Sequence, residues 1–235
     1  MSVVPVRIPA PASFELWLVR LDVELSAADA DLLDDQERAR AARFAFERDR
    51  RRFVAAHAAL RRLLGDKTGQ APHMLRFDIG SLGKPRLRGR ADAVFSLSHS
   101  ADLALVALAD DGEIGVDLEP VRPMRDLEAL ARQCLSAGEC LQFEALGEPG
   151  RTAAFLQAWT RKEACLKALG TGLQIEPAAV ETGLETAVRR VVVATSEGAR
   201  ELVVSSLVPA PGWVGALAQV SGGPKGGMAT PHARR

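Results

Sequence analysis

Residues 155–169, FLQAWTRKEACLKAL, combine a helical pattern with side chains that could do chemistry. Trp159, Glu163 and Lys167 are spaced four apart, so in an α-helix they form a slanting row of ring, carboxylate and ammonium. Apolar side chains occupy the adjoining arc, which predicts a helix that packs on one side and presents this row at its edge. A carboxylate and an ammonium at such an edge could bind a metal ion, take up a proton or neutralise phosphate charge.

A second acidic motif, GVDLEP at 115–120, is strand-like, and its Asp117 and Glu119 point to one face by the two-residue period of a strand. Mg²⁺ takes oxygen ligands and is usually bound by one or two carboxylates together with substrate phosphates. These acids suit a metal site, to which Glu163 could add a third oxygen. The alternative is two solvated acids at the end of an edge strand.

Two further motifs could bind phosphate. FSLSHS at 95–100 alternates, so Ser98 lies with the other serines and His99 falls on the apolar face unless the strand ends first. A histidine beside hydroxyls can donate to phosphate, although a structural histidine is the alternative. In LGKPRL at 82–87, Lys84 stands between a glycine and Pro85 on a turn, which predicts an exposed ammonium that either binds phosphate or is merely solvated.

The local excess of positive charge lies between residues 37 and 62. Arginine forks there could grip a phosphomonoester or an acidic protein, although the run could equally be a solvated helix face. DNA binding would need interleaved aromatic residues, and these are sparse. The arginines of this run are Arg38, Arg40, Arg43, Arg48, Arg50, Arg51, Arg52, Arg61 and Arg62, against Glu37, Glu47 and Asp49.

Lys162 falls by its helical angle inside the apolar arc of the 155–169 helix, so either it extends to the helix edge or that arc opens onto a ligand. The cysteines, Cys134, Cys140 and Cys165, show no zinc-ligand spacing and are expected to be reduced packing residues. Cys165 is on the apolar arc and is therefore expected to be buried.

Composition excludes several classes of protein. The chain has 235 residues, 47% of them hydrophobic, which is enough for one large domain or two closely packed halves. Thirty basic and thirty acidic residues give no net charge, so nucleic acid is not an expected partner. No apolar run approaches a membrane span and the N-terminus lacks signal-peptide features, so a cytoplasmic location is expected.

The elements that must position these residues follow from periodicity and turn signals. A strand at 14–23 precedes a helix that begins at Ser26 and runs to about residue 46, and a second helix spans about 49–64 and stops at Gly65. The second half is expected to consist of helices followed by strands, and the Gly- and Pro-rich tail, 221–235, to be disordered. Further strands are expected at 74–79, 93–98, 103–109, 113–118, 188–194, 201–208 and 213–220, and helices at 126–134 and from Ser136.

Taken in order, GKP at 83–85, SLSHS at 96–100, GVDLEP at 115–120 and WTRKEACLKALGTGL at 159–173 resemble the 4′-phosphopantetheinyl transferases of the larger, surfactin-synthetase-activating type. The resemblance covers most of residues 35–175. It implies an α/β (α+β) fold of two similar halves related by a pseudo-twofold, 1–110 on the nucleotide side and 111–220 on the metal side. Coenzyme A would lie in the cleft between them, and the chain would be a monomer.

The resemblance also implies a reaction, in which the phosphopantetheine arm of coenzyme A moves to a serine of an apo carrier protein and 3′,5′-ADP is released. By the same resemblance, Mg²⁺ is held by Asp117, Glu119 and Glu163, with Glu163 as base and Lys167 neutralising charge. The nucleotide end is assigned to Arg40, Arg43, Arg52, Lys84, Pro85, Ser98, His99 and Lys167, while one position of the family's basic pair is Glu37 here.

Two other functions compete with transfer. A catalytically silent relative would bind coenzyme A or a carrier protein, but intact Asp117, Glu119, Glu163 and Lys167 argue against it. From the residues alone, another Mg²⁺-dependent nucleotide hydrolase is also possible. The pathway of the carrier, whether fatty-acid, polyketide or peptide synthesis, is a surface property that the motifs do not specify.

Overall fold

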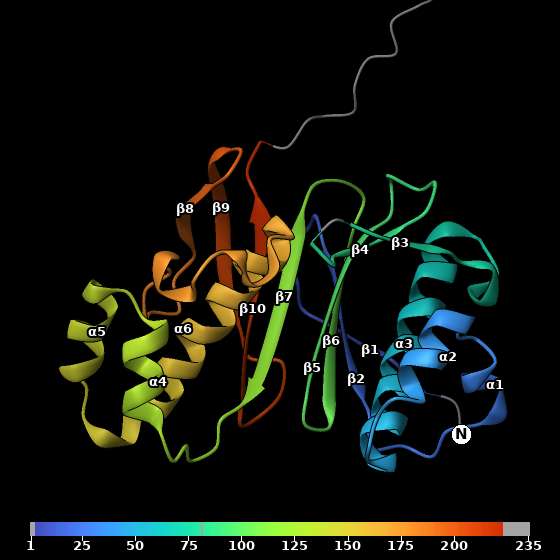
Figure 1. Ribbon diagram of the computed structural model, residues 1–235, viewed down its shortest axis with the longest axis horizontal. Helices are drawn as coiled ribbons and strands as arrows, with labels where there is room; N and C mark the ends of the chain where they lie inside the picture. Colours follow the sequence, from blue (N-terminus) through green and yellow to red (C-terminus); the bar gives the residue numbers. More distant parts are fainter. Residues whose placement is uncertain (1–2, 81, 223–235) are drawn as a thin grey trace, which may run out of the picture.

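The computed structural model describes residues 3–80 and 82–222. Most of the tail predicted to be disordered therefore lies outside the described residues. The chain forms a mixed α/β structure with two four-stranded antiparallel sheets, as expected for the fold class (Figure 1). No described helix is long and apolar enough to cross a membrane.

The first sheet has the order β1-β2-β6-β5 and the second the order β7-β10-β9-β8, while β3 and β4 form a separate hairpin. The first half of the chain contributes β1 (Val6–Ile8), β2 (Glu15–Arg20), α1 (Ala27–Ala30), α2 (Asp35–Ala41), α3 (Glu47–Thr68), β3 (Phe77–Ile79), β4 (Pro85–Leu87), β5 (Val94–Ser100) and β6 (Leu103–Ala109). The second half contributes β7 (Ile114–Pro120), α4 (Leu127–Cys134), α5 (Ala137–Glu144), α6 (Glu148–Leu169), β8 (Arg189–Thr195), β9 (Gly198–Leu207) and β10 (Trp213–Val220). Short 3₁₀ turns cover Pro72–Met74, Gly172–Gln174 and Pro177–Ala179.

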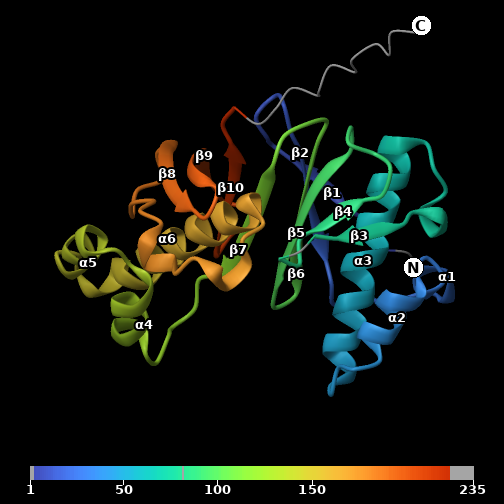
Figure 2. The same ribbon diagram turned by 45° about the horizontal axis from the view of Figure 1, so that its top comes forward.

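The two sheets pack face to face, with a long helix on each outer side (Figures 1 and 2). Strand β6, LALVALA, is buried throughout: Leu103 and Leu105 contact a core shared with the second sheet, whereas Ala104 and Val106 contact a core covered by α3. On the far side, α6 packs on the second sheet through residues such as Cys165. This layering explains the continuous apolar run, because both faces of β6 are covered.

The edge strands β5 and β7 lie side by side where the two sheets meet (Figure 1). Side chains link them, since the Ser96 hydroxyl accepts a hydrogen bond from the Val116 amide at 3.1 Å. Each half therefore contributes one strand to this junction. The division at residue 110 and the pseudo-twofold remain predictions.

Several predicted boundaries were wrong for local reasons. The helix expected from Ser26 to residue 46 is two short helices, because Asp34 forms a capping box with Glu37 and starts α2 anew. Helix α3 continues through Gly65 and ends at Gly69, whose φ of 70° is the left-handed conformation typical of a helix end. Gly65 is instead a packing glycine, since a Cβ there would lie 2.9 Å from the Gln70 carbonyl oxygen.

Other elements agree with the sequence prediction or extend it. The strands at 103–109 and 213–220 have the predicted bounds, and Ser136 caps α5 through the predicted box with Glu139. The strand expected at 74–79 is confined to β3, because the 3₁₀ turn includes Met74 and Leu75 caps that turn. The LGKPRL segment contains strand β4 in addition to the predicted turn, and β1 was not predicted.

Candidate active site

Strand β7 presents its acids because its two faces have different partners. Val116 and Leu118 enter the core between the sheets, so Asp117 and Glu119 face the other way. Gly115 shares their face and lies against α6, where a Cβ would be only 2.1 Å from the Ala164 carbonyl oxygen. The absence of a side chain at Gly115 thus lets α6 approach the acidic strand directly.

Helix α6 brings the predicted row to that strand. Between Phe155 and Ala168 the partly exposed residues are Trp159, Glu163 and Lys167, while the rest are buried. The Lys167 ammonium donates to Asp117 Oδ1 at 2.6 Å and to the Ser98 hydroxyl at 2.8 Å. The row on α6 and the paired acids of β7 are 40 and more residues apart in the chain. Together they form one charged cluster, which consists of Asp117, Glu119, Glu163 and Lys167.

Trp159 does not contribute a polar contact to this cluster. It packs among the apolar residues of α4 and α5 and stacks on Phe155, with ring centroids 6.5 Å apart. The tryptophan thus fixes the middle of α6 against α4 and α5.

The acids of the cluster are partly removed from water and repel one another. Burial raises the pKa of Glu163, and the negative charges of Asp117 and Glu119 raise it further, whereas Lys167 opposes this. Burial also raises the pKa of Glu119, although the Ser100 hydroxyl donates to its Oε2 at 2.6 Å. A carboxylate with a raised pKa is a better proton acceptor, and a cation between such groups would relieve their repulsion.

The donor set fits a hard cation such as Mg²⁺. Asp117 Oδ2 is buried and has no hydrogen-bond partner within residues 3–80 and 82–222, which leaves one carboxylate oxygen of this acid unsatisfied. Burying such an oxygen is costly unless something binds it. Within the same residues, no group of three or more His, Cys, Asp or Glu side chains is gathered closely enough to hold a metal ion. Two carboxylates with substrate phosphates are enough for Mg²⁺, and here Lys167 and Ser98 contact Asp117 while Ser100 contacts Glu119.

Beside the cluster lies a cleft of about 690 Å³, large enough for a nucleotide-sized ligand. Glu163 and Lys167 line one wall, and helices α2 and α3 supply basic side chains to the other. Among the predicted site residues, the cleft is lined by Arg40, Lys84, Pro85, His99, Glu163 and Lys167, whereas Asp117 and Glu119 lie in the adjoining cluster.

His99 is accessible in the cleft, on the face of β5 that carries Phe95 and Leu97, as predicted from the alternation. The surrounding protein partly shields the ring from water and so lowers the pKa of His99, and the nearby positive charges of Lys167 and Arg40 lower it further. The ring is therefore mostly neutral at pH 7 and can both donate and accept a hydrogen bond.

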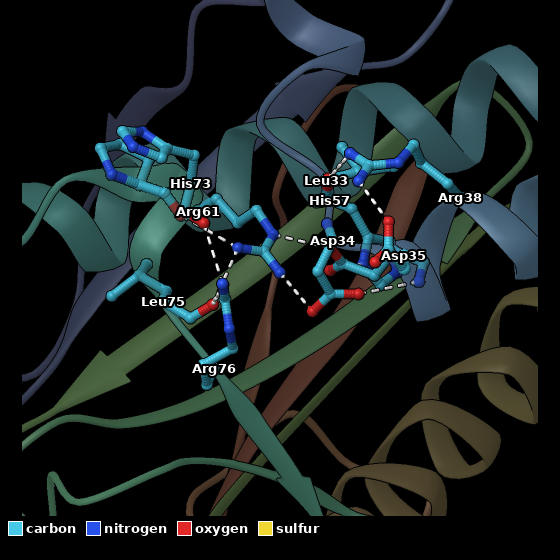
Figure 3. Close-up of polar contacts among 11 residues, drawn as sticks. Leu33, Asp34, Asp35, Arg38, His57, Arg61, His73, Leu75 and Arg76 are labelled. Atoms are coloured by element: carbon cyan, nitrogen blue, oxygen red, sulfur yellow. Dashed lines mark hydrogen bonds and ion pairs between the residues drawn. The ribbon is translucent and has the colours of Figure 1, made fainter.

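His57, which was not predicted as a site residue, lies on α3 and lines the same wall as Arg40. Its Nδ1 lies 2.8 Å from Glu37 Oε1, and Arg61 Nε donates to Glu37 Oε2 at 2.7 Å. Arg61 is fully buried and also donates to Asp34 and to the Pro72 and Leu75 carbonyls (Figure 3). Glu37, which departs from the family's basic pair, thus holds a histidine at the cleft.

Three predicted nucleotide ligands are placed differently from the expectation. Lys84 was predicted to be an exposed ammonium, and this is wrong: its Nζ donates to Glu113 at 2.8 Å and to the Ala168 carbonyl at 2.8 Å. Arg52 forms a two-bond ion pair with Asp22, both bonds at 2.6 Å, and does not line the cleft. Arg43 is exposed and also outside the lining.

Lys162 follows neither of the two alternatives that its position left open. It is fully buried, its ammonium lies 2.6 Å from Glu139 Oε2, and it also donates to the Pro177 and Val180 carbonyls. Burial alone would raise the pKa of Glu139, but this ion pair and three backbone N–H groups hold it below its ordinary value. Lys162 therefore holds the segment 177–180 against α6.

The cysteines are packing residues, as expected. Cys134 and Cys165 are buried, and burial raises the pKa of the Cys165 thiol to about 12. A thiol with such a pKa is almost entirely protonated at neutral pH and is a poor nucleophile. Cys165 consequently takes no part in the chemistry of the cluster.

Two family models match the chain. The model described as "4′-phosphopantetheinyl transferase, N-terminal" matches residues 22–111, and that of the "4′-phosphopantetheinyl transferase superfamily" matches residues 113–206. The second range contains the acids of β7 and the row of α6. The first contains the arginines, histidines and serines of the opposite wall.

Curated relatives point to the same family. The chain is 41% identical over 163 residues to the 4′-phosphopantetheinyl transferase HetI of Nostoc sp., which covers 67% of this chain and 69% of that protein. It is 39% identical over 116 residues to AcpT of Salmonella typhimurium, a match that covers 49% of this chain and 59% of that protein. It is 32% identical over 138 residues to psf-1 of Bacillus pumilus, a match that covers 59% of this chain and 58% of that protein. The chain belongs to the 4′-phosphopantetheinyl transferase family and is a transferase, which confirms the predicted family and class of enzyme.

Proposed function

We propose that the chain transfers the 4′-phosphopantetheine arm of coenzyme A to a serine of an apo carrier protein, in a Mg²⁺-dependent reaction that releases 3′,5′-ADP. The observation that carries this proposal is the joining of two features: a cleft of about 690 Å³ with basic residues on one wall, and the cluster of Asp117, Glu119, Glu163 and Lys167 at its edge. A nucleotide and its pyrophosphate need these two environments side by side.

Asp117, Glu119 and Glu163 would hold Mg²⁺, which supplies neutralising charge for the pyrophosphate when it is bound. Lys167 adds a positive charge at the same place, through the ammonium that contacts Asp117. Glu163, whose pKa is raised by burial, is the proposed base that takes the proton of the attacking serine hydroxyl. The bond formed joins the serine oxygen to phosphorus, and the bond broken releases the nucleotide.

The nucleotide end of coenzyme A is proposed to lie along Arg40 and His99, with His57 beside them. Arg40 lies over the Phe53 ring, its guanidinium carbon 5.4 Å from the centroid, and its charge remains available to a phosphate. Geometry favours these residues over Arg43, Arg52 and Lys84, since the last two are engaged in ion pairs.

We further propose that the chain is of the larger, surfactin-synthetase-activating type, a monomer that works in the cytoplasm. The presence of two four-stranded sheets within one chain supports a single-chain enzyme. Residues 1–110 and 111–220 are the proposed halves. The similar proteins include HetI, AcpT and psf-1, which do not single out one class of carrier.

The experiment incubates the protein with coenzyme A, MgCl₂ and a panel of apo carrier proteins, and weighs each carrier intact. We expect a mass gain of one phosphopantetheine group that EDTA abolishes. Asp117→Ala and Glu163→Ala should each lower the rate about a hundredfold or more, while His99→Ala should mainly weaken coenzyme A binding.

Two outcomes would reject the proposal. Coenzyme A binding without any carrier modification across the panel would indicate a silent relative. Release of phosphate or nucleotide without a carrier would indicate a hydrolase. A fully active Asp117→Ala enzyme would refute the metal assignment while leaving the transfer itself intact.

A further inference from the structure

The serines of β5 form a ladder of hydroxyls against β7, and we define this serine ladder as Ser96, Ser98 and Ser100. Ser96 accepts from a backbone amide of β7, whereas the other two donate to carboxylates. Ser98 Oγ donates to Asp117 Oδ1 and Ser100 Oγ to Glu119 Oε2, each at 2.6 Å. Alternation along two neighbouring strands thus gives each acid of β7 its own hydroxyl.

Each hydroxyl engages one oxygen of its carboxylate. Asp117 Oδ1 receives both Ser98 and Lys167, while Oδ2 is buried and has no hydrogen-bond partner among the described residues. The Asp117 side chain is only 6% exposed, so water does not readily replace a missing partner. Glu119 has the same division, since Ser100 contacts its Oε2 alone.

We propose that Ser98 and Ser100 are positioning residues that restrict Asp117 and Glu119 to binding a cation through one oxygen each, and that they thereby favour Mg²⁺ over Ca²⁺. The inference rests on the proposed Mg²⁺-dependent function. It also gives Ser98 a different role from the nucleotide contact that the family resemblance implies.

The physical reason is the different demand of the two ions. Mg²⁺ takes six ligands in a compact octahedron and usually binds one oxygen of a carboxylate. Ca²⁺ takes six to eight ligands and often binds both oxygens of a carboxylate. Short hydrogen bonds to a charged acceptor are among the stronger ones in proteins. Asp117 Oδ1 accepts from both Ser98 and Lys167, which occupy its two lone-pair sites and leave Oδ2 for a cation. Ser100 fixes the rotation of the Glu119 carboxylate through Oε2, so the ladder disfavours two-oxygen binding, which Ca²⁺ uses more often than Mg²⁺.

The test measures Mg²⁺ and Ca²⁺ affinities by isothermal titration calorimetry of the full chain with coenzyme A present. The variants are Ser100→Ala, Ser98→Ala and the conservative Ser100→Thr. Ser96→Ala is the matched control, because Ser96 belongs to the same ladder but contacts no carboxylate in it. Thermal unfolding of each variant verifies that it is folded.

We expect Ser100→Ala and Ser98→Ala to lower the ratio of Mg²⁺ to Ca²⁺ affinity about tenfold or more, the size typical of losing a group that orients a metal ligand. Ser100→Thr retains the hydroxyl and should keep the wild-type ratio, as should Ser96→Ala. Wild-type ratios in folded Ser100→Ala and Ser98→Ala would overturn the inference while leaving the proposed function standing. A wild-type protein that binds neither cation in the presence of coenzyme A would overturn both, so the two failures are distinguishable.

Discussion

Replacing Gly115 by alanine tests whether the close approach of α6 to β7 builds the site. The new Cβ would lie 2.1 Å from the Ala164 carbonyl oxygen and 2.4 Å from the Ala168 amide nitrogen, and both are backbone atoms. Since ordinary contact begins near 3.4 Å, α6 would have to move away from β7 by about 1.3 Å. That movement would separate Lys167 from Asp117, which now bond at 2.6 Å.

A displacement of about 1 Å in a catalytic group can cost roughly a hundredfold in rate, and overpacking a core costs about 1–3 kcal/mol. We therefore expect Gly115→Ala to lower turnover about tenfold to hundredfold at saturating coenzyme A and to lower the free energy of unfolding by about 1–3 kcal/mol. Carrier modification is followed by intact mass and stability by urea unfolding.

The matched control is Gly150→Ala, on the same helix, where a Cβ would meet nothing within 4 Å. Alanine is there expected to be neutral or to stabilise the protein by up to about 1 kcal/mol, with unchanged turnover. A Gly115→Ala enzyme with wild-type turnover and stability would refute the reasoning, because it would show that α6 does not need this contact distance.

Three further predictions concern ionisable side chains that are largely or fully buried. Glu139→Gln should lower the free energy of unfolding by about 3–5 kcal/mol at pH 7, because it leaves the buried Lys162 unpaired. Since the folded pKa of Glu139 is below its ordinary value of 4.5, its stabilisation is complete above that pH and is lost as the pH falls, so urea titrations should show the deficit of the variant shrinking below about pH 4.5. Cys165, with its pKa of about 12, should resist iodoacetamide at pH 8 in the native state and react once urea unfolds the protein, as peptide mass mapping would show; labelling of the native protein would contradict its burial. Lys84→Met should lower the thermal midpoint yet leave the preference for coenzyme A over dephospho-coenzyme A unchanged, whereas a lost preference would restore Lys84 as a phosphate ligand.

The parts of the fold that the sequence predicted well are those decided by local periodicity. The run LALVALA has no polar position to place at solvent, so both faces of β6 must be covered, and its bounds were predicted correctly. The row of Trp159, Glu163 and Lys167 follows from helical spacing alone, and their partial exposure among buried neighbours confirms it.

The errors arise where a distant partner decides the state of a side chain. Lys84 is an exposed turn lysine by local pattern, but its ammonium meets Glu113 and a carbonyl at the end of α6, 84 residues away. Arg52 is likewise occupied by Asp22, 30 residues earlier. No property of the local sequence records these pairings, and each one engages with an acid a charge that was predicted to bind the nucleotide.

Lys162 and His57 illustrate the same limit in buried positions. Helical angle correctly assigned Lys162 to the apolar arc, and the partner that makes this possible is Glu139, already used by the capping box of α5. His57 could have been noticed as a polar residue within the apolar side of α3. Its orientation, however, depends on Glu37, which is held by Arg61.

The location of the site at a junction has a mechanical consequence. Strand β5 belongs to the first sheet and β7 to the second, and hydroxyls rather than a backbone ladder connect them at the acids. Ser98 and Ser100 come from one half, whereas Asp117, Glu119 and Lys167 come from the other. A slip of β5 by one residue would turn its hydroxyls to the opposite face and replace them with apolar side chains. The acids are therefore correctly held only when both halves are folded and in register, which couples the proposed catalytic geometry to the packing of the two sheets.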